Sequence, residues 1–424
     1  MKALLSFDKA PPFAAPLRFF LTAPLFGVLA GVLLAIDGGA ALGSRWTPSA
    51  LALTHLLTVG FMLQIMLGAL IQILPVVAGA SLAQPLLVAR VVHGGLTPGA
   101  LLLVAGLRFG QLALLEWAAL LLAATVLAFL VAAALALWRV PSTSPSIRGL
   151  KLALGALSVV IALGLLLAFA LARGWPLALR ELADLHAGWG LGGWAGVLLA
   201  AVAFVVVPMF QLTPGYPTRA AWLFPLMVML ALLVWSAALL MELPILVRAA
   251  QLTLAASGIA FALLTLRLQS KRRRGRADAT YRYWQLGMIA SALALLMMCF
   301  AAMFPALAAQ AAWTPLFGIL LISGGFVSFI NGMLYKIVPF LAWLHLQQRA
   351  QTRVPSMNKF LANVATHRQW QAHVAALVLL LGTPLLPWLA LPAGLACAVA
   401  NAWLGWNLWS VVRHYRRLVA TIPQ

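Results

Sequence analysis

The feature that constrains this chain most is a series of long apolar stretches that recur along its whole length. Each runs for roughly twenty residues, which is the length of α-helix that crosses the hydrocarbon core of a bilayer. The stretches do not alternate between apolar and polar residues, as the strands of a membrane β-barrel do. Apolar residues make up 64% of the chain and charged residues 8%, whereas soluble domains are about 45–50% apolar. The sequence therefore predicts an all-α, polytopic membrane bundle that forms a single domain over residues 1–424.

A window of bilayer length predicts twelve transmembrane spans. They cover residues 17–37, 50–76, 85–107, 111–138, 149–173, 183–210, 219–241, 244–269, 282–306, 313–342, 370–388 and 391–413. Lys2, Lys9 and Arg18 precede the first span and resemble the start of a signal peptide, but the apolar run is too long for one. We therefore expect a retained first helix.

Lys and Arg are distributed unevenly between the loops that these spans predict. With the N-terminus inside, the outer loops carry only five of the 28 Lys and Arg residues, namely Arg45, Arg108, Arg173, Arg180 and Arg248. The positive-inside rule then places both termini in the cytoplasm and favours an even number of spans. We expect a multi-pass protein of the bacterial inner (cytoplasmic) membrane.

The net charge of +21 and the run KRRRGR at 271–276 are typical of nucleic-acid binding in a soluble protein. Because this run lies between two predicted spans, we interpret it as a cytoplasmic anchor on anionic lipid headgroups. The expected partner is the lipid bilayer and not nucleic acid. Cys299 and Cys397 each lie alone in an apolar run, which predicts neither a disulfide nor a zinc site.

Three of the predicted spans share a spacing of small residues and proline. Spans 2 and 10 carry Gly-Gly-Pro, and span 6 carries Gly-Ala-Pro, with separations of eight and seven residues in each: Gly60, Gly68 and Pro75; Gly324, Gly332 and Pro339; Gly193, Ala201 and Pro208. The pattern predicts three pseudo-symmetric four-helix arcs, at about 17–138, 149–269 and 282–413, each with one helix in the interior. We expect each proline to end or bend its helix.

Twelve helices in three such arcs is the layout of heme–copper oxidase subunit I, which this chain resembles. A closer local likeness is to the NnrS-like group, membrane proteins associated with the bacterial response to nitric oxide. The motif of that group is similar to His55, Gly60, Gly68, Pro75 and Gly79. The resemblance implies a heme- or copper-binding protein linked to nitric oxide or respiratory metabolism, with respiratory or denitrification membrane proteins as partners.

Two histidines are the candidate metal ligands, because His55 opens span 2 and His186 opens span 6 near the outer face. Imidazole is a common ligand of heme iron and copper. His186 shares a helical face with Gly190 and Gly193, which leaves room for a flat cofactor walled by Trp189 and Trp194. The same face also suits a closely packed neighbouring helix, with His186 bonded to a carbonyl, and both alternatives stay open. The remaining histidines of the second half, His345, His367, His373 and His414, are expected at the inner surface or its margins.

The departures from the oxidase pattern limit the activity that the resemblance implies. Span 7 contains no histidine, and span 10 begins WTPLFG without one, so at most two of the six ligand positions of that family are occupied. Oxygen reduction is therefore not expected, and enzymatic activity stays undecided. Arg45 and Arg180 near the outer ends are candidates for pairing with heme propionates, or they anchor their loops.

Several polar residues lie in the inner halves of spans 2 and 10, namely Gln64, Gln72, Asn331, Tyr335 and Lys336. Polar groups inside a membrane are costly and often functional. They line a proton or solute path, or they form hydrogen bonds between helices.

Two other functions remain open beside metal binding. One is a secondary transporter or permease, and the other is a noncatalytic subunit of a respiratory assembly.

Overall fold

The computed structural model describes residues 7–273, 275, 277–350 and 354–421, and all the regular secondary structure within them is helical. The α-helices are α1 (Ala14–Asp37), α2 (Pro48–His55), α3 (Gln64–Ala78), α4 (Pro85–Phe109), α5 (Leu112–Leu137), α6 (Pro145–Arg173), α7 (Leu179–Ala187), α8 (Val197–Gln211), α9 (Thr218–Leu240), α10 (Pro244–Ser270), α11 (Ala279–Met303), α12 (Pro305–Ala308), α13 (Trp313–Gly318), α14 (Ser328–Arg349), α15 (Asn363–Gly382) and α16 (Ala390–Ala420). Short 3₁₀ helices are η1 (Phe7–Lys9), η2 (Gly38–Leu42), η6 (Met357–Lys359) and η7 (Pro387–Leu389).

Within the described residues, eleven continuous helical stretches are long and apolar enough to cross a membrane. This confirms the prediction of an all-helical, multi-pass membrane fold. The predicted span at 370–388 corresponds to α15. This helix is not one of the stretches that are long and apolar enough. It covers Asn363–Gly382 instead of 370–388. It begins earlier because its first two turns include the polar residues His367 and Arg368, and it ends earlier because Pro384 and Pro387 follow. Proline lacks the amide hydrogen that would continue the helix.

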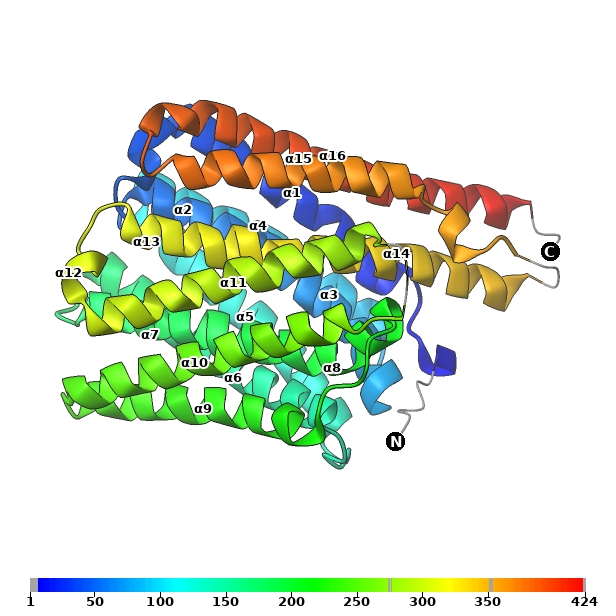
Figure 1. Ribbon diagram of the computed structural model, residues 1–424, viewed down its shortest axis with the longest axis horizontal. Coiled ribbons are helices and arrows are strands. Elements are labelled where there is room, and N and C mark those ends of the chain that lie inside the picture. The colour runs from blue at the N-terminus through cyan, green and yellow to red at the C-terminus, as the bar shows by residue number, and fades with distance from the viewer. Residues whose placement is uncertain (1–6, 274, 276, 351–353, 422–424) are drawn as a thin grey trace.

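The long helices form a closed circuit of neighbours around the bundle. Each of the following consecutive pairs is in contact: α1 with α4, α4 with α5, α5 with α6, α6 with α9, α9 with α10, α10 with α11, α11 with α15, α15 with α16, and α16 with α1. Figure 1 shows these helices running side by side along the long axis of the molecule. The chain thus encloses the three stretches that are absent from this circuit.

The three enclosed stretches are those that carry the repeated glycine and proline spacing. They are Pro48–Ala78, Leu179–Gln211 and Trp313–Arg349, and 78%, 56% and 72% of their most apolar windows are buried, against 22–50% in the other eight. A helix that is apolar on all sides and buried belongs in the interior of a large bundle. The repeat therefore identified the interior helices.

Each interior stretch contains a π-helical segment in its first half. These segments are η3 (Leu56–Leu63), η4 (Gly188–Gly196) and η5 (Ile319–Val327). They end at corresponding positions of the repeat, because Leu63, Gly196 and Val327 each lie twelve residues before the shared proline. A π-helical segment winds more residues into each turn and often marks a functional site. It also changes which side chains share a face, so helical-wheel positions deduced from a regular α-helix shift there.

The repeated prolines do not all have the same effect. After Pro75 and Pro208, helices α3 and α8 continue for three residues and end at Ala78 and Gln211. After Pro339, in contrast, α14 continues to Arg349. Of the two expected effects, an end or a bend, the helix ends shortly after the proline at two of the three positions.

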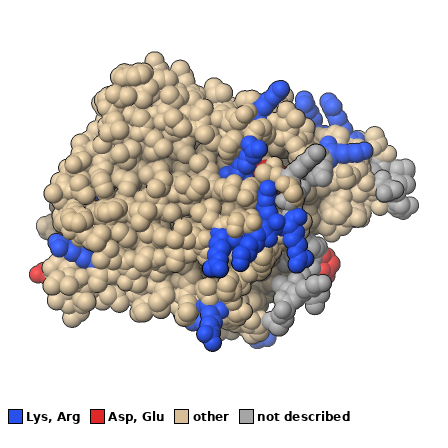
Figure 2. Space-filling view, viewed as in Figure 1, with Lys and Arg blue, Asp and Glu red and all other residues tan. Residues whose placement is uncertain are grey.

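Charged side chains are concentrated at one end of the bundle. Helix α1 begins and α16 ends there, and most Lys and Arg visible in Figure 2 lie at this end, on the right of Figures 1 and 2. We call it the basic end. Lys2, Arg274, Arg276 and Arg353, which the inner loops were predicted to carry, lie outside the described residues. At the opposite end, Arg108 binds Asp37 through two hydrogen bonds of 2.7 and 2.8 Å, and Arg173 binds Glu116 at 2.8 Å.

Close contact between α1 and α16 generates a prediction about Gly31. A Cβ atom at this position would lie 2.4 Å from the backbone nitrogen of Ala398 and 2.5 Å from the carbonyl oxygen of Gly394. Backbone atoms cannot yield as a flexible side chain does, so Gly31→Ala should lower the free energy of unfolding by about 1–3 kcal/mol. Thermal unfolding in detergent measures the change.

The matched control is Gly155→Ala in α6, where no atom lies within 4 Å of the added Cβ. This variant should unfold at the wild-type temperature or slightly above it, because alanine favours helix over glycine. Equal behaviour of the two variants would show that α1 and α16 do not approach as closely as described.

Candidate functional site

His55 is the last residue of α2 and immediately precedes the π-helical segment η3. Its Nδ1 lies 2.8 Å from the carbonyl oxygen of Leu51. A carbonyl only accepts hydrogen bonds, so Nδ1 carries the proton and Nε2 keeps its lone pair. This bond fixes the ring and leaves the nitrogen that metals bind, which is how metal-binding histidines are usually oriented.

His186 lies two residues before the π-helical segment η4 and faces helix α6. Its Cε1 is 3.2 Å from the position that a Cβ of Gly164 would occupy, and its ring also contacts the backbone carbonyl of Val160. Nδ1 is buried and has no hydrogen-bond partner among the described residues. A buried nitrogen without a partner is rare in folded proteins and calls for an explanation.

These two imidazoles come from two interior stretches. His55 lies directly before η3 and His186 two residues before η4, so they occupy matching positions of the two stretches. His55 commits Nδ1 to a backbone carbonyl and keeps Nε2 open, and His186 keeps Nδ1 open. No third His, Cys, Asp or Glu in the part of the chain that the structure describes joins them in a cluster able to hold a metal ion.

The glycine face beside His186 is occupied by neighbouring helices. A Cβ on Gly190 would lie 3.9 Å from Val160, and one on Gly193 would lie 3.1 Å from Ala156, both in α6. Gly193 also faces Leu232 of α9 at 2.9 Å. His186, Gly190 and Gly193 thus share a face as predicted, and helix α6 packs against it. This arrangement matches the alternative in which the glycines admit a neighbouring helix.

The two tryptophans expected as walls of a cofactor pocket are instead buried in the core. Trp189 is 3% exposed and donates from Nε1 to the Ser236 hydroxyl at 3.0 Å, and Trp194 is 5% exposed. Neither lines the large cavity described next.

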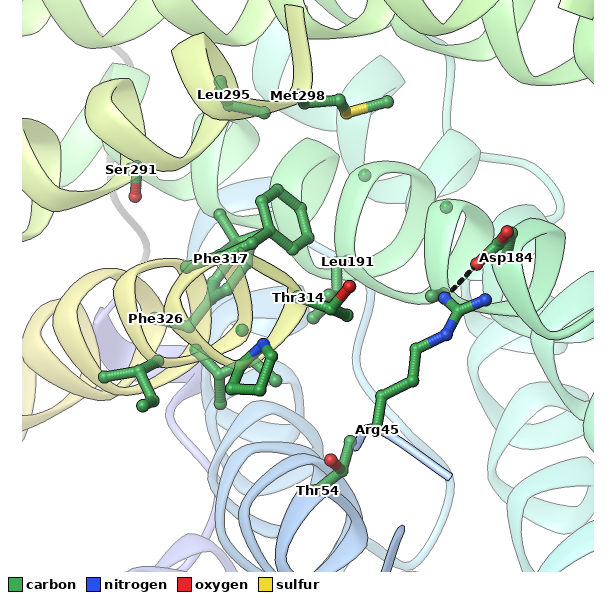
Figure 3. A pocket seen from close by; sticks show the side chains of 18 of the residues that line it. Arg45, Thr54, Asp184, Leu191, Ser291, Leu295, Met298, Thr314, Phe317 and Phe326 are labelled. Atoms are coloured by element: carbon green, nitrogen blue, oxygen red, sulfur yellow. Dashed lines mark hydrogen bonds and ion pairs between the residues drawn. The ribbon is translucent and has the colours of Figure 1, made fainter. Parts of the chain in front are cut away.

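A cavity of about 1480 Å³ lies beside the interior stretches. This exceeds the ≈ 300–1,000 Å³ of ordinary small-molecule pockets. Its walls are mainly apolar and come from α1, α2, η4, α9, α10, α11, η5, α15 and α16. In Figure 3, Leu191, Phe317 and Phe326, which come from η4, α13 and η5, lie around the same space. Its charged residues, Arg45, Arg180, Glu181, Asp184, Glu242 and Arg248, all belong to segments at the end opposite the basic end.

The six residues predicted to form one site are divided between two places. Arg45 and Arg180 line the cavity, whereas the lining does not include His55, His186, Gly190 or Gly193. Arg45 forms an ion pair with Asp184, shown by the dashed line in Figure 3. This pair joins the loop before α2, the helix that ends at His55, to α7, which carries His186. Arg180 is exposed on the first turn of α7 and forms no ion pair with another described residue.

A third histidine, His373, does not lie at its expected position. It was expected at the inner margin, but it lies in the middle of α15 and lines the cavity. It is 7% exposed, and its Nε2 is 2.9 Å from the Ser328 hydroxyl of α14. The error follows from the position of α15, because a helix that begins at Asn363 places His373 ten residues inside it. The polar run before the apolar stretch was the signal that the helix starts earlier.

Comparison with known proteins adds no family assignment. No protein-family model matches the sequence, and no curated protein matches it significantly.

The ion pair between Arg45 and Asp184 generates a second prediction. Both side chains are about one-third exposed, 34% and 38%, so solvent screens their attraction, and exposed pairs contribute about 0.2–1 kcal/mol. A double-mutant cycle with Arg45→Gln and Asp184→Asn should give a coupling free energy of unfolding in this range. A coupling well above it would mean that the pair holds the two spans together, contrary to our interpretation that helix packing does so.

Proposed function

We propose that this chain is an integral membrane metal-binding protein in which His55 and His186 hold heme iron or copper. The observation that carries the proposal is that His55 and His186 lie at matching positions, just before the π-helical segments of two interior stretches, and that His186 Nδ1 is buried without a hydrogen-bond partner among the described residues. Two neutral imidazoles satisfy the ligand preferences of copper and of heme iron. The remaining open nitrogen on each ring is the atom that would bind.

The residues present fit a metal ion more directly than a large flat cofactor. A copper ion needs only the two free ring nitrogens, whereas a porphyrin also needs a cleft, and α6 and α9 fill the glycine face beside His186. Bound iron or copper supplies one-electron chemistry and affinity for small ligands such as nitric oxide. The chain itself orients the His55 ring through the Leu51 carbonyl, and both rings are half-buried between neighbouring helices.

The proposed context follows the resemblance to heme–copper oxidase subunit I and the NnrS-like group. The chain then has twelve spans in three arcs, with α15 as the eleventh span and the basic end in the cytoplasm of a bacterium. It acts in nitric oxide or respiratory metabolism without the ligand set for oxygen reduction. As a noncatalytic subunit it would act beside respiratory or denitrification membrane proteins.

Metal analysis of histidine variants tests the proposal. Protein purified from cells supplied with copper and heme should contain either copper or a heme absorption band. Because each ring supplies half of the protein ligands, His55→Ala or His186→Ala should lower metal occupancy by about tenfold or more. His93→Ala is the matched control, because this histidine is half-buried in α4 and bonded to Thr22 at 2.8 Å, outside the site.

A second variant keeps both ligands and disturbs only their position. Gly164→Ala places a Cβ 3.2 Å from His186 Cε1, so the ring must shift, and metal affinity should fall while folding is retained. Gly155→Ala on the same helix should leave affinity unchanged. Wild-type protein that carries neither metal nor heme from replete cells, or metal that persists in both histidine variants, would contradict the proposal.

The cavity favours a second candidate function, the transport of an amphipathic solute. Its walls are apolar while its charged residues belong to one end of the bundle, an arrangement that suits a molecule with an apolar body and a polar head. Proteoliposomes should then take up a fluorescent fatty acid at wild-type rate after His55→Ala, and Ala187→Trp should block uptake by filling the cavity that Ala187 lines. Uptake equal to protein-free liposomes would eliminate this candidate.

A further inference from the structure

Beneath the cavity, toward the basic end, α11, α14, α15 and α16 enclose a cluster of buried polar side chains. Its members are Asp278, Tyr283, Ser328, Asn331, Tyr335, Lys336, Gln369, His373 and Asn407. Burying polar groups within a membrane bundle is costly, and where it occurs it commonly marks an ion or proton pathway. We infer that this cluster is a proton path that joins the basic end to His373 in the cavity wall.

The path begins at an ion pair near the basic end. Lys336 Nζ lies 2.7 Å from Asp278 Oδ2, and the two side chains are 11% and 16% exposed. Asp278 caps the first turn of α11 by accepting from the Tyr281 amide at 2.9 Å. A carboxylate at this position, close to the surface but largely covered, can exchange protons with water at the basic end.

Two tyrosines form the central part of the path. The hydroxyls of Tyr283 and Tyr335 both donate to Oε1 of Gln369, at 2.5 and 3.0 Å. Asn407 donates to the Tyr335 hydroxyl at 2.9 Å. The Gln369 amide does not transfer protons itself, but it holds both hydroxyls at one oxygen atom, so a proton can pass between them when the hydroxyls reorient.

The upper part of the path leads from Tyr283 to the cavity. Asn331 contacts the Tyr283 hydroxyl, and its Oδ1 is buried with no hydrogen-bond partner. An unpaired buried acceptor of this kind is a position at which a structural water binds. One turn along α14, the Ser328 hydroxyl lies 2.9 Å from His373 Nε2. The Tyr283 ring packs on His373 with centroids 5.3 Å apart.

The distances suit a chain of side chains and bound water. His373 lies ten residues into α15, which corresponds to about 15 Å from the start of that helix. Two steps have no direct hydrogen bond among the described residues. In the first, Lys336 directly follows Tyr335 in α14, and in the second, Asn331 and Ser328 lie three residues apart on that helix, a rise of about 4.5 Å. Bound water would bridge both steps.

Each transfer in this path breaks one O–H or N–H bond and forms another, so no oxidant or reductant takes part. Ser328 gives its proton to His373 Nε2 as it receives one from the water at Asn331. The resulting imidazolium releases a proton from Nδ1 to the cavity. Around His373, α11 contributes the ionisable Tyr283 and α14 the neutral Ser328, while the thiol of Cys397 in α16 lines the same cavity. No charged side chain of the described residues is in recorded contact with His373.

Proton uptake by proteoliposomes tests the path. Liposomes that contain the full chain and an internal pH-sensitive dye are given a potassium diffusion potential, and acidification of the interior is followed. Wild-type protein should take up protons faster than protein-free liposomes. Tyr283→Phe and Ser328→Ala each remove only a hydroxyl and should reduce uptake to the protein-free level.

The matched control is Tyr216→Phe, which also removes a buried tyrosine hydroxyl, bonded to Thr265 at 3.0 Å, but lies outside the path. It should conduct as wild type does. Thermal unfolding shows whether each variant is folded. Wild-type uptake no faster than that of protein-free liposomes, or uptake that survives Tyr283→Phe and Ser328→Ala, would overturn the inference.

Discussion

Close approach of helix backbones at small residues is the constraint on which this architecture depends. Lipid is as apolar as leucine, so the hydrophobic effect does not drive helices together within a bilayer, and close packing must do so. At Gly31 and Gly394, α1 and α16 come so near that each glycine's missing Cβ would meet backbone atoms of the other helix. Gly68 likewise faces Phe19 of α1, and Gly332 faces Tyr283 of α11. These contacts fix the interior stretches against the surrounding helices and thereby determine where their histidines lie.

The sequence predicted much of the fold because bilayer length and small-residue spacing are local signals. The recurrence of Gly60, Gly193 and Gly324 identified the three interior stretches without any knowledge of contacts. The π-helical segments were not predicted, since they depend on how each stretch packs against its neighbours. The eleventh helix was misplaced for a related reason. His367 and Arg368 look like loop residues in a hydropathy window, although a helix that reaches the membrane surface readily carries them.

The candidate site was only partly predictable. Sequence position predicted His55 and His186 at the same depth, and in the structure each lies just before the π-helical segment of its interior stretch. Gly190 and Gly193 were interpreted as room for a cofactor or for a helix, and helix α6 fills that room. The separation of Arg45 and Arg180 from the histidines depends on which side of each interior stretch faces the cavity. That side is set by how each stretch packs against its neighbours, which helical spacing alone does not reveal.

The interior stretches contribute to two candidate functional regions, a pair of imidazoles and a large cavity with a polar path to the basic end. X-ray absorption spectroscopy at the copper and iron edges of the purified protein tests its central claim most directly. We predict a stoichiometric metal whose spectrum contains the outer-shell scattering of two imidazole rings. A metal surrounded only by oxygen or sulfur, or one present in trace amounts, would contradict the claim that His55 and His186 form a metal site.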